Sequence, residues 1–125
     1  MNQAARPRDS GLLHMRLPIG AVASILHRVT GLFLIPVVVA LLVFLREALA
    51  SANGYARVVA VVHGLPARVL GPVVVWVVAQ HTYAGIRHLV LDAGLVSGRR
   101  AMRKSAGAVL VAALATAALA VAVWP

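Results

Sequence analysis

The chain has 125 residues, of which 62% are hydrophobic and 12% are charged, and its mean hydropathy of +0.92 indicates a membrane protein rather than a soluble domain. Its net charge of +9 comes from 12 Lys and Arg scattered at segment ends, and aromatic residues are few, so the pattern argues against nucleic-acid binding. The absence of cysteine excludes disulfides, iron–sulfur ligation and covalent haem attachment within this chain.

Three apolar stretches are long enough to cross a bilayer core of roughly 30 Å, which requires about 20 helical residues. They are residues 19–45, 69–95 and 106–124. The intervening residues 46–68 contain several glycine and proline breakers and are predicted to form a loop with short helical pieces. The expected fold is therefore an all-α integral membrane protein with three transmembrane helices.

The distribution of Lys and Arg predicts the orientation of these spans. The N-terminal segment, residues 1–18, and the basic loop, residues 96–105, must lie on the same side of the membrane. Together they carry seven cations, against three in residues 46–68; the seven are Arg6, Arg8, Arg16, Arg99, Arg100, Arg103 and Lys104. This bias predicts a cytoplasmic N-terminus and places residues 46–68 on the outer, periplasmic side. The N-terminal segment has no apolar core, so it is not interpreted as a signal peptide.

The second span contains a stripe of small and ionisable residues in the run HTYAGIRH. Helical spacing puts His81, Gly85 and His88 on one face, with His81 near the middle of the bilayer. A neutral imidazole is a common axial ligand of haem iron, and a glycine leaves room for a flat macrocycle. A structural histidine and ordinary close helix packing through Gly85 are the alternative interpretations.

Two further charges follow on the same helix. Arg87 lies on a different face from His81 and could extend to the lipid headgroups instead of taking part in a site. Asp92 lies near the helix C-terminus, where a carboxylate opposes the helix dipole, which suggests a basic tertiary partner. The third span is rich in alanine and valine and is interpreted as a packing helix.

The first half of the first span contains the run SILHRVTG, residues 24–31, which brings a hydroxyl and a guanidinium together. Ser24 and Arg28 are four residues apart and share a face, as do His27 and Gly31. Ser24 could bond to a carbonyl one turn earlier while Arg28 extends to headgroups. Alternatively, both could donate hydrogen bonds to a carbonyl of a membrane quinone. Position alone does not separate these interpretations.

The runs RLPIGAVASILHRVTG and HTYAGIRHLVLDAG, with the three-span layout, resemble the cytochrome b subunits of succinate:quinone oxidoreductases, or succinate dehydrogenases (respiratory complex II). In that family the chain would be the larger of two small membrane anchors. The resemblance implies a haem- and quinone-binding subunit that passes electrons from an iron–sulfur subunit to quinone. The resemblance also implies that the chain is a subunit of an enzyme, to which it would contribute the quinone site but not the succinate site and no catalytic residue.

Site roles follow from the resemblance residue by residue. His81 would be an axial ligand of one b-type haem, whose other ligand comes from the second anchor subunit. His27, Arg28, Gly85 and His88 would form the pocket around the haem and its propionates, and Ser24 and Arg28 would bind quinone. The implied partners are the second anchor, the iron–sulfur subunit, the flavoprotein subunit and the lipid bilayer, and the implied location is a bacterial inner membrane or an equivalent energy-transducing membrane.

Two alternative functions remain open from the sequence. The first is the anchor of a fumarate reductase or another b-type cytochrome, which would use the same groups in a different direction. The second is a small proton or ion transporter subunit, in which His81 and Arg28 would line a path for ions. The residues do not decide the direction of electron flow.

Overall fold

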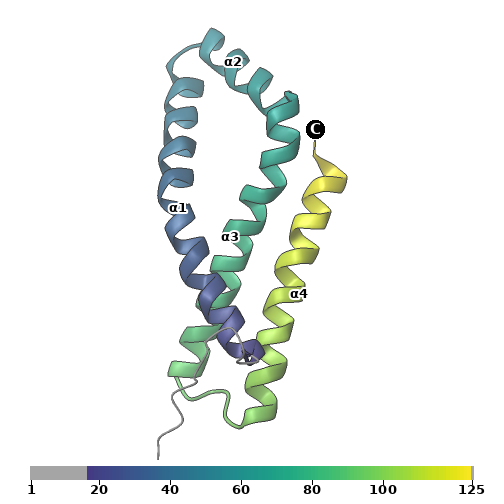
Figure 1. Cartoon of the computed structure of the whole chain (residues 1–125). Helices are drawn as coiled ribbons and strands as arrows, with labels where there is room; N and C mark the ends of the chain where they lie inside the picture. The colour runs from purple at the N-terminus through teal and green to yellow at the C-terminus, as the bar shows by residue number, and fades with distance from the viewer. Residues whose placement is uncertain (1–16, 125) are drawn as a thin grey trace, which may run out of the picture.

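The computed structural model describes residues 17–124, and these fold into four consecutive helices. They are α1 (Ile19–Ala50), α2 (Ala52–His63), α3 (Leu65–Asp92) and α4 (Arg99–Val123). Helices α1, α3 and α4 are long and run roughly along one axis, and the short helix α2 crosses between the upper ends of α1 and α3 (Figure 1). The fold is thus an antiparallel helical arrangement with no strand among the described residues.

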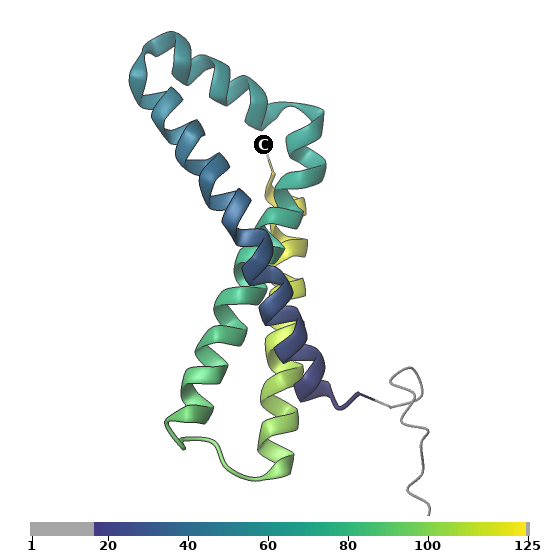
Figure 2. The same ribbon diagram turned by 60° about the vertical axis from the view of Figure 1, so that its left-hand side comes forward.

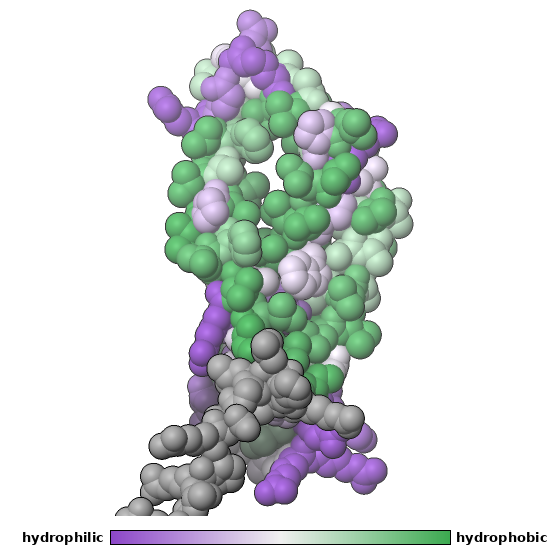
Figure 3. Space-filling model, in the orientation of Figure 1, coloured by the Kyte–Doolittle hydropathy of each residue, from purple (hydrophilic) through white to green (hydrophobic). Residues whose placement is uncertain are grey.

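Helices α1, α3 and α4 are each long and apolar enough to cross a membrane. Their large hydrophobic side chains point outward, and Leu32, Leu41 and Leu119 are all more than half exposed. Figure 3 shows apolar side chains covering the middle of the molecule, with hydrophilic residues at the two ends. A soluble protein rarely exposes such a large apolar surface, so these faces are suited to lipid or to other membrane helices.

Small residues form the contact faces between the three long helices. The fully buried apolar residues include Ala23 on α1, Ala84 on α3 and both Ala106 and Ala113 on α4. Ala106 and Ala113 are two turns apart and therefore lie on the same face of α4. In a bilayer, helices associate through close van der Waals packing, which small side chains permit. The contacts between helices therefore depend on alanine and glycine more than on large apolar side chains.

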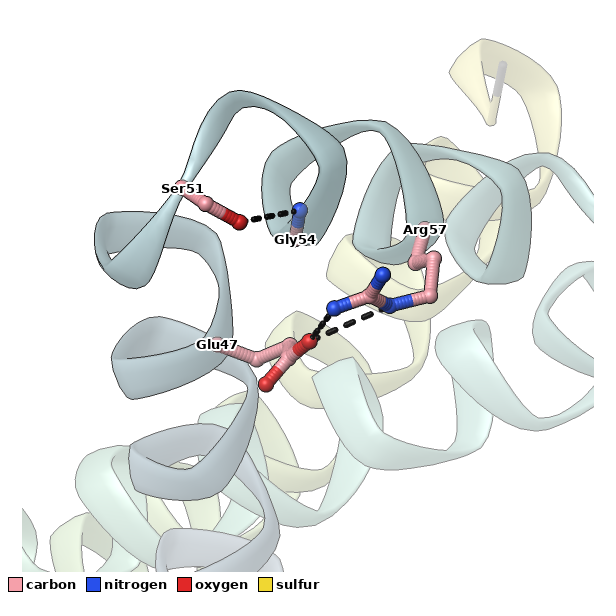
Figure 4. Close-up of polar contacts among 4 residues, drawn as sticks. All are labelled: Glu47, Ser51, Gly54 and Arg57. Atoms are coloured by element: carbon pink, nitrogen blue, oxygen red, sulfur yellow. Dashed lines mark hydrogen bonds and ion pairs between the residues drawn. The ribbon is translucent and has the colours of Figure 1, made fainter.

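The connection between α1 and α2 is a tight corner that polar contacts stabilise (Figure 4). Ser51 caps α2, because its hydroxyl oxygen accepts the backbone N–H of Gly54 at 2.9 Å. Arg57 on α2 forms an ion pair with Glu47 in the last turn of α1. At the C-terminal end of α4, the indole N–H of Trp124 donates to the carbonyl of Val62 at 3.2 Å, which ties α4 to α2.

Two regions differ from the sequence prediction because helix continues through them. Residues 46–68, predicted as a loop with short helical pieces, comprise the end of α1, all of α2 and the beginning of α3. Residues 96–105, predicted as a basic loop, contain the first two turns of α4 from Arg99 onward. The loop ends at Gly98, whose φ of +91° glycine adopts readily, and the Arg and Lys residues that follow are good helix formers.

Candidate functional site

Helices α1 and α3 approach each other closely where glycines lie opposite histidines. A Cβ at Gly31 of α1 would lie 3.0 Å from Cε1 of His81, and a Cβ at Gly85 of α3 would lie 3.3 Å from Nε2 of His27. Both distances are tighter than ordinary van der Waals contact, so a larger residue would push the imidazoles away. The reciprocal pairing brings the two sequence motifs together. Figure 2 shows the crossing of α1 and α3.

Three imidazoles form a cluster at this crossing. The rings of His27 and His81 are stacked, with centroids 4.3 Å apart and an interplanar angle of 16°. The ring of His88 lies 5.1 Å from that of His27 and is tilted by 53°. All three side chains are partly exposed, so the cluster can be reached from outside the chain. His81 lies 11 residues before the end of α3, about 16 Å along the helix axis, which is well inside a bilayer core.

One hydrogen bond orients the imidazole of His81. Its Nδ1 lies 3.1 Å from the backbone carbonyl oxygen of His27. A carbonyl can only accept, so Nδ1 carries a proton and donates it, and the tautomer that keeps this bond in a neutral ring has its lone pair on Nε2. Nε2 forms no hydrogen bond with any other described residue. Metal-bound histidines commonly make such a bond through the second ring nitrogen, because it orients the ring and raises its basicity.

Arg87 is buried against α4, so the alternative in which it extends to the headgroups is wrong. Its side chain is 8% exposed, and Nε donates to the hydroxyl of Ser105 at 3.1 Å while Nη2 donates to the carbonyl of Met102 at 3.2 Å. The face of α3 opposite the histidines therefore packs on α4, and the arginine finds neutral acceptors there. Sequence spacing places Arg87 on another face from His81 but cannot show that Ser105 lies opposite.

The two residues predicted to bind quinone lie beside the histidine cluster without joining it. Ser24 is half-buried and Arg28 is exposed, both in the first turns of α1. Neither side chain forms a hydrogen bond with another described residue.

Asp92 is exposed and forms no ion pair within residues 17–124, so the basic partner expected from its position is not among them. The cations Arg6, Arg8 and Arg16 lie outside the described residues.

Two polar residues are buried in a way that the sequence did not predict. Thr30 is 1% exposed, and its hydroxyl lies within hydrogen-bond distance of the carbonyls of Leu26 and His27. Gln80 is fully buried, and neither atom of its amide has a partner among the described residues. A helical wheel places both residues on apolar faces, so only the packed structure reveals that they are enclosed.

Comparison with known proteins identifies the class to which this arrangement belongs. The family model for the succinate dehydrogenase/fumarate reductase transmembrane subunit matches residues 2–121. The chain belongs to this family and is an integral membrane protein of the cytochrome b type. It is 30% identical over 119 residues to the succinate dehydrogenase cytochrome b556 subunit of Paracoccus denitrificans, and the match covers 95% of this chain and 92% of that protein. The resemblance inferred from the two sequence motifs is thereby confirmed.

Proposed function

We propose that the chain is the haem b- and quinone-binding anchor of a succinate dehydrogenase and passes electrons from an iron–sulfur subunit to membrane quinone. The observation that carries the proposal is the hydrogen bond between Nδ1 of His81 and the carbonyl of His27, which leaves Nε2 available as a ligand. The match to a succinate dehydrogenase subunit over 95% of the chain supports the direction of electron flow. The family assignment favours this function over an ion transporter.

The residues of the cluster fit a b-type haem. His81 offers a neutral, oriented nitrogen at membrane depth, and Gly31 lets the ring pack close to α1. The ring of His27 stacks on that of His81, and the ring of His88 lies 5.1 Å from that of His27. The exposed Arg28 follows His27 in the sequence, so imidazole and guanidinium groups near the ligand could bind the haem propionates. A bound haem would supply reversible one-electron transfer. His27 stacks on His81 and also fills the space beside Gly85, so we expect His27 to rotate when haem binds.

Residues 17–124 supply one such ligand, His81, so we propose that a second anchor subunit supplies the other. No group of three or more His, Cys, Asp or Glu suited to a metal ion occurs within residues 17–124. Haem would then be shared at the face where the imidazoles are partly exposed. The flavin and iron–sulfur centres needed to oxidise succinate would lie on two further subunits, because this chain has no cysteine.

Substitution of His81 tests the axial assignment. In the assembled complex, His81→Ala should abolish or severely weaken the reduced haem b spectrum, because the ligand nitrogen is lost. His63→Ala is a matched control, since His63 is exposed at the end of α2. It should leave the spectrum unchanged. A normal reduced spectrum in the His81→Ala complex would show that His81 is not the ligand.

The quinone assignment to Ser24 and Arg28 rests on their position at the start of α1. Both side chains could donate to a quinone carbonyl, and the donors are not used within the described structure. Because this end is proposed to be cytoplasmic, the protons needed for quinone reduction would come from the aqueous phase on that side. An orientation with the N-terminus in the cytoplasm would also bring the site next to the iron–sulfur subunit.

Two assays on the same membranes test this assignment. Arg28→Leu should lower quinone reduction by roughly 10- to 150-fold, because a hydrogen bond from a charged donor contributes about 1.5 to 3 kcal/mol. Ser24→Ala should have a smaller effect. Succinate oxidation with a soluble artificial acceptor should be unchanged in both variants. The control is Arg46→Leu, which alters an exposed arginine at the other end of α1 and should leave both activities unchanged. An unchanged ratio of the two activities in both site variants would exclude the quinone role.

A further inference from the structure

The hydroxyl of Thr30 has two acceptors within reach on its own helix. Oγ1 lies 2.7 Å from the carbonyl oxygen of Leu26 and 3.1 Å from that of His27, so its one hydrogen is shared between the two, with the closer contact to Leu26. A threonine in a helix often bonds to a carbonyl three or four residues earlier, and this alone would be a local packing arrangement. Thr30 differs from an ordinary case because it is 1% exposed and faces the contact between helices.

The carbonyl of His27 also accepts a bond from another helix. Nδ1 of His81 on α3 donates to this same oxygen at 3.1 Å. His27 lies within α1, so its carbonyl is in addition an acceptor for a backbone N–H four residues later. A carbonyl oxygen has two lone pairs, so these donors compete for limited acceptor capacity. The hydrogen bond from His81 to the His27 carbonyl is therefore weaker when the Thr30 hydroxyl also donates to that oxygen.

We propose that Thr30 is a positioning residue that sets the electron donation of His81 by sharing the His27 carbonyl. The inference rests on the proposed function, in which His81 ligates haem iron through Nε2. A stronger bond at Nδ1 makes the imidazole more basic and stabilises the oxidised iron, which lowers the midpoint potential. The hydroxyl of Thr30 weakens that bond and so raises the potential. No side chain that touches haem or quinone needs to change for this effect.

The geometry also limits other ways in which the ring could respond. One edge of His81 lies against Gly31, where a Cβ would be only 3.0 Å from Cε1, and Nδ1 bonds to the backbone carbonyl of His27. The ring therefore has little room to turn when the bond at Nδ1 changes. A change at Thr30 should alter the strength of the bond more than the orientation of the imidazole.

The test compares three variants in the complete complex. Thr30→Val removes the hydroxyl and keeps the shape, while Thr30→Ser keeps the hydroxyl and removes a methyl group. Thr116→Val is the matched control, because Thr116 also bonds to a carbonyl four residues earlier but lies on α4 and contacts Tyr83. Haem content, the midpoint potential from a redox titration and the low-spin electron paramagnetic resonance spectrum are measured for each.

We expect Thr30→Val to retain haem with a lower midpoint potential and a shifted low-spin signal, whereas Thr30→Ser and Thr116→Val match the unaltered complex. Equal midpoint potentials for Thr30→Val and the unaltered complex would overturn the proposal. Equal shifts of the midpoint potential in Thr30→Val and Thr30→Ser would also overturn it. Should the valine variant fail to assemble, Thr30→Ala and Thr30→Ser are compared, and equal potentials again overturn it. Failure of the axial assignment itself is recognised separately, because His81→Ala would then keep its haem.

Discussion

The two ends of the helical arrangement are stabilised in different ways. At the histidine end, defined here by His27, His81, His88 and Arg87, polar groups of different helices bond to each other while they are partly or fully buried. At the α2 end, defined by α2, Glu47 and Trp124, the contacts are exposed or lie at chain corners. Figure 1 shows α1 diverging from α3 toward the α2 end, and residues 38–46 of α1 are all exposed.

This difference indicates a division of roles along the molecule. Buried polar groups are expensive in a bilayer unless they bond internally, so the bonds at the histidine end hold α1, α3 and α4 together, as a cofactor site between helices requires. The α2 end leaves the apolar surface of α1 unpaired within the described residues, which suits contact with lipid or with the helices of a partner. The conformation of the α2 end therefore has less influence on the site.

The largest stability effect is expected from Arg87, which joins α3 to α4 at the histidine end. Arg87→Met should destabilise the solubilised complex by about 2 kcal/mol, because two hydrogen bonds with a charged donor are lost while the aliphatic volume is kept. The measurement is the thermal unfolding midpoint in detergent. Arg68→Met is the control, since Arg68 is exposed in the first turn of α3. Equal midpoints for the two variants would mean that Arg87 does not join the helices.

The sequence predicted the three long helices and most of the candidate site because both follow from local patterns. Apolar length gave the spans, and the spacing of His81, Gly85 and His88 gave their shared face. Helix periodicity says nothing about which helix lies opposite, so the stacking of His27 on His81 and the pairing of Arg87 with Ser105 required the structure. The roles of the site residues in binding haem and quinone stay predictions.

The extent of α2 and the start of α4 were harder to predict for a different reason. Glycine and proline in residues 46–68 suggested a loop, but they lie at helix termini, where these residues are tolerated. Gly64 is the residue between α2 and α3, and Pro66 lies in the first turn of α3. These glycine and proline residues therefore mark boundaries between helices. The number of such residues in a segment does not show whether the segment is a loop or a boundary between two helices.

A smaller effect is expected at Gly71, where α3 meets the end of α4. A Cβ at this position would overlap the indole ring of Trp124, whereas a Cβ at Gly107 would make an ordinary contact with Ile19 at 3.6 Å. Alanine is favoured over glycine in a helix by about 0.5 to 1 kcal/mol, so Gly107→Ala should raise the thermal midpoint. In Gly71→Ala, the overlap with the indole should cancel this gain in stability. If the overlap also breaks the hydrogen bond from Trp124 to Val62, the variant should be less stable by about 1 kcal/mol more. A midpoint for Gly71→Ala as high as that for Gly107→Ala would show that the indole packing contributes nothing.

The smallest effect is expected for the ion pair between Glu47 and Arg57 at the corner of α1 and α2. The two side chains are 43% and 65% exposed, so water and salt screen their attraction, and Glu47→Gln should cost less than about 1 kcal/mol. Ser51→Ala removes the cap of α2 at the same corner and should cost about 1 kcal/mol. Raising the salt concentration should reduce the cost of Glu47→Gln and leave that of Ser51→Ala nearly unchanged, because the cap does not depend on a charge. If Glu47→Gln instead destabilises the complex as much as Arg87→Met, the two ends of the molecule do not differ in the way proposed.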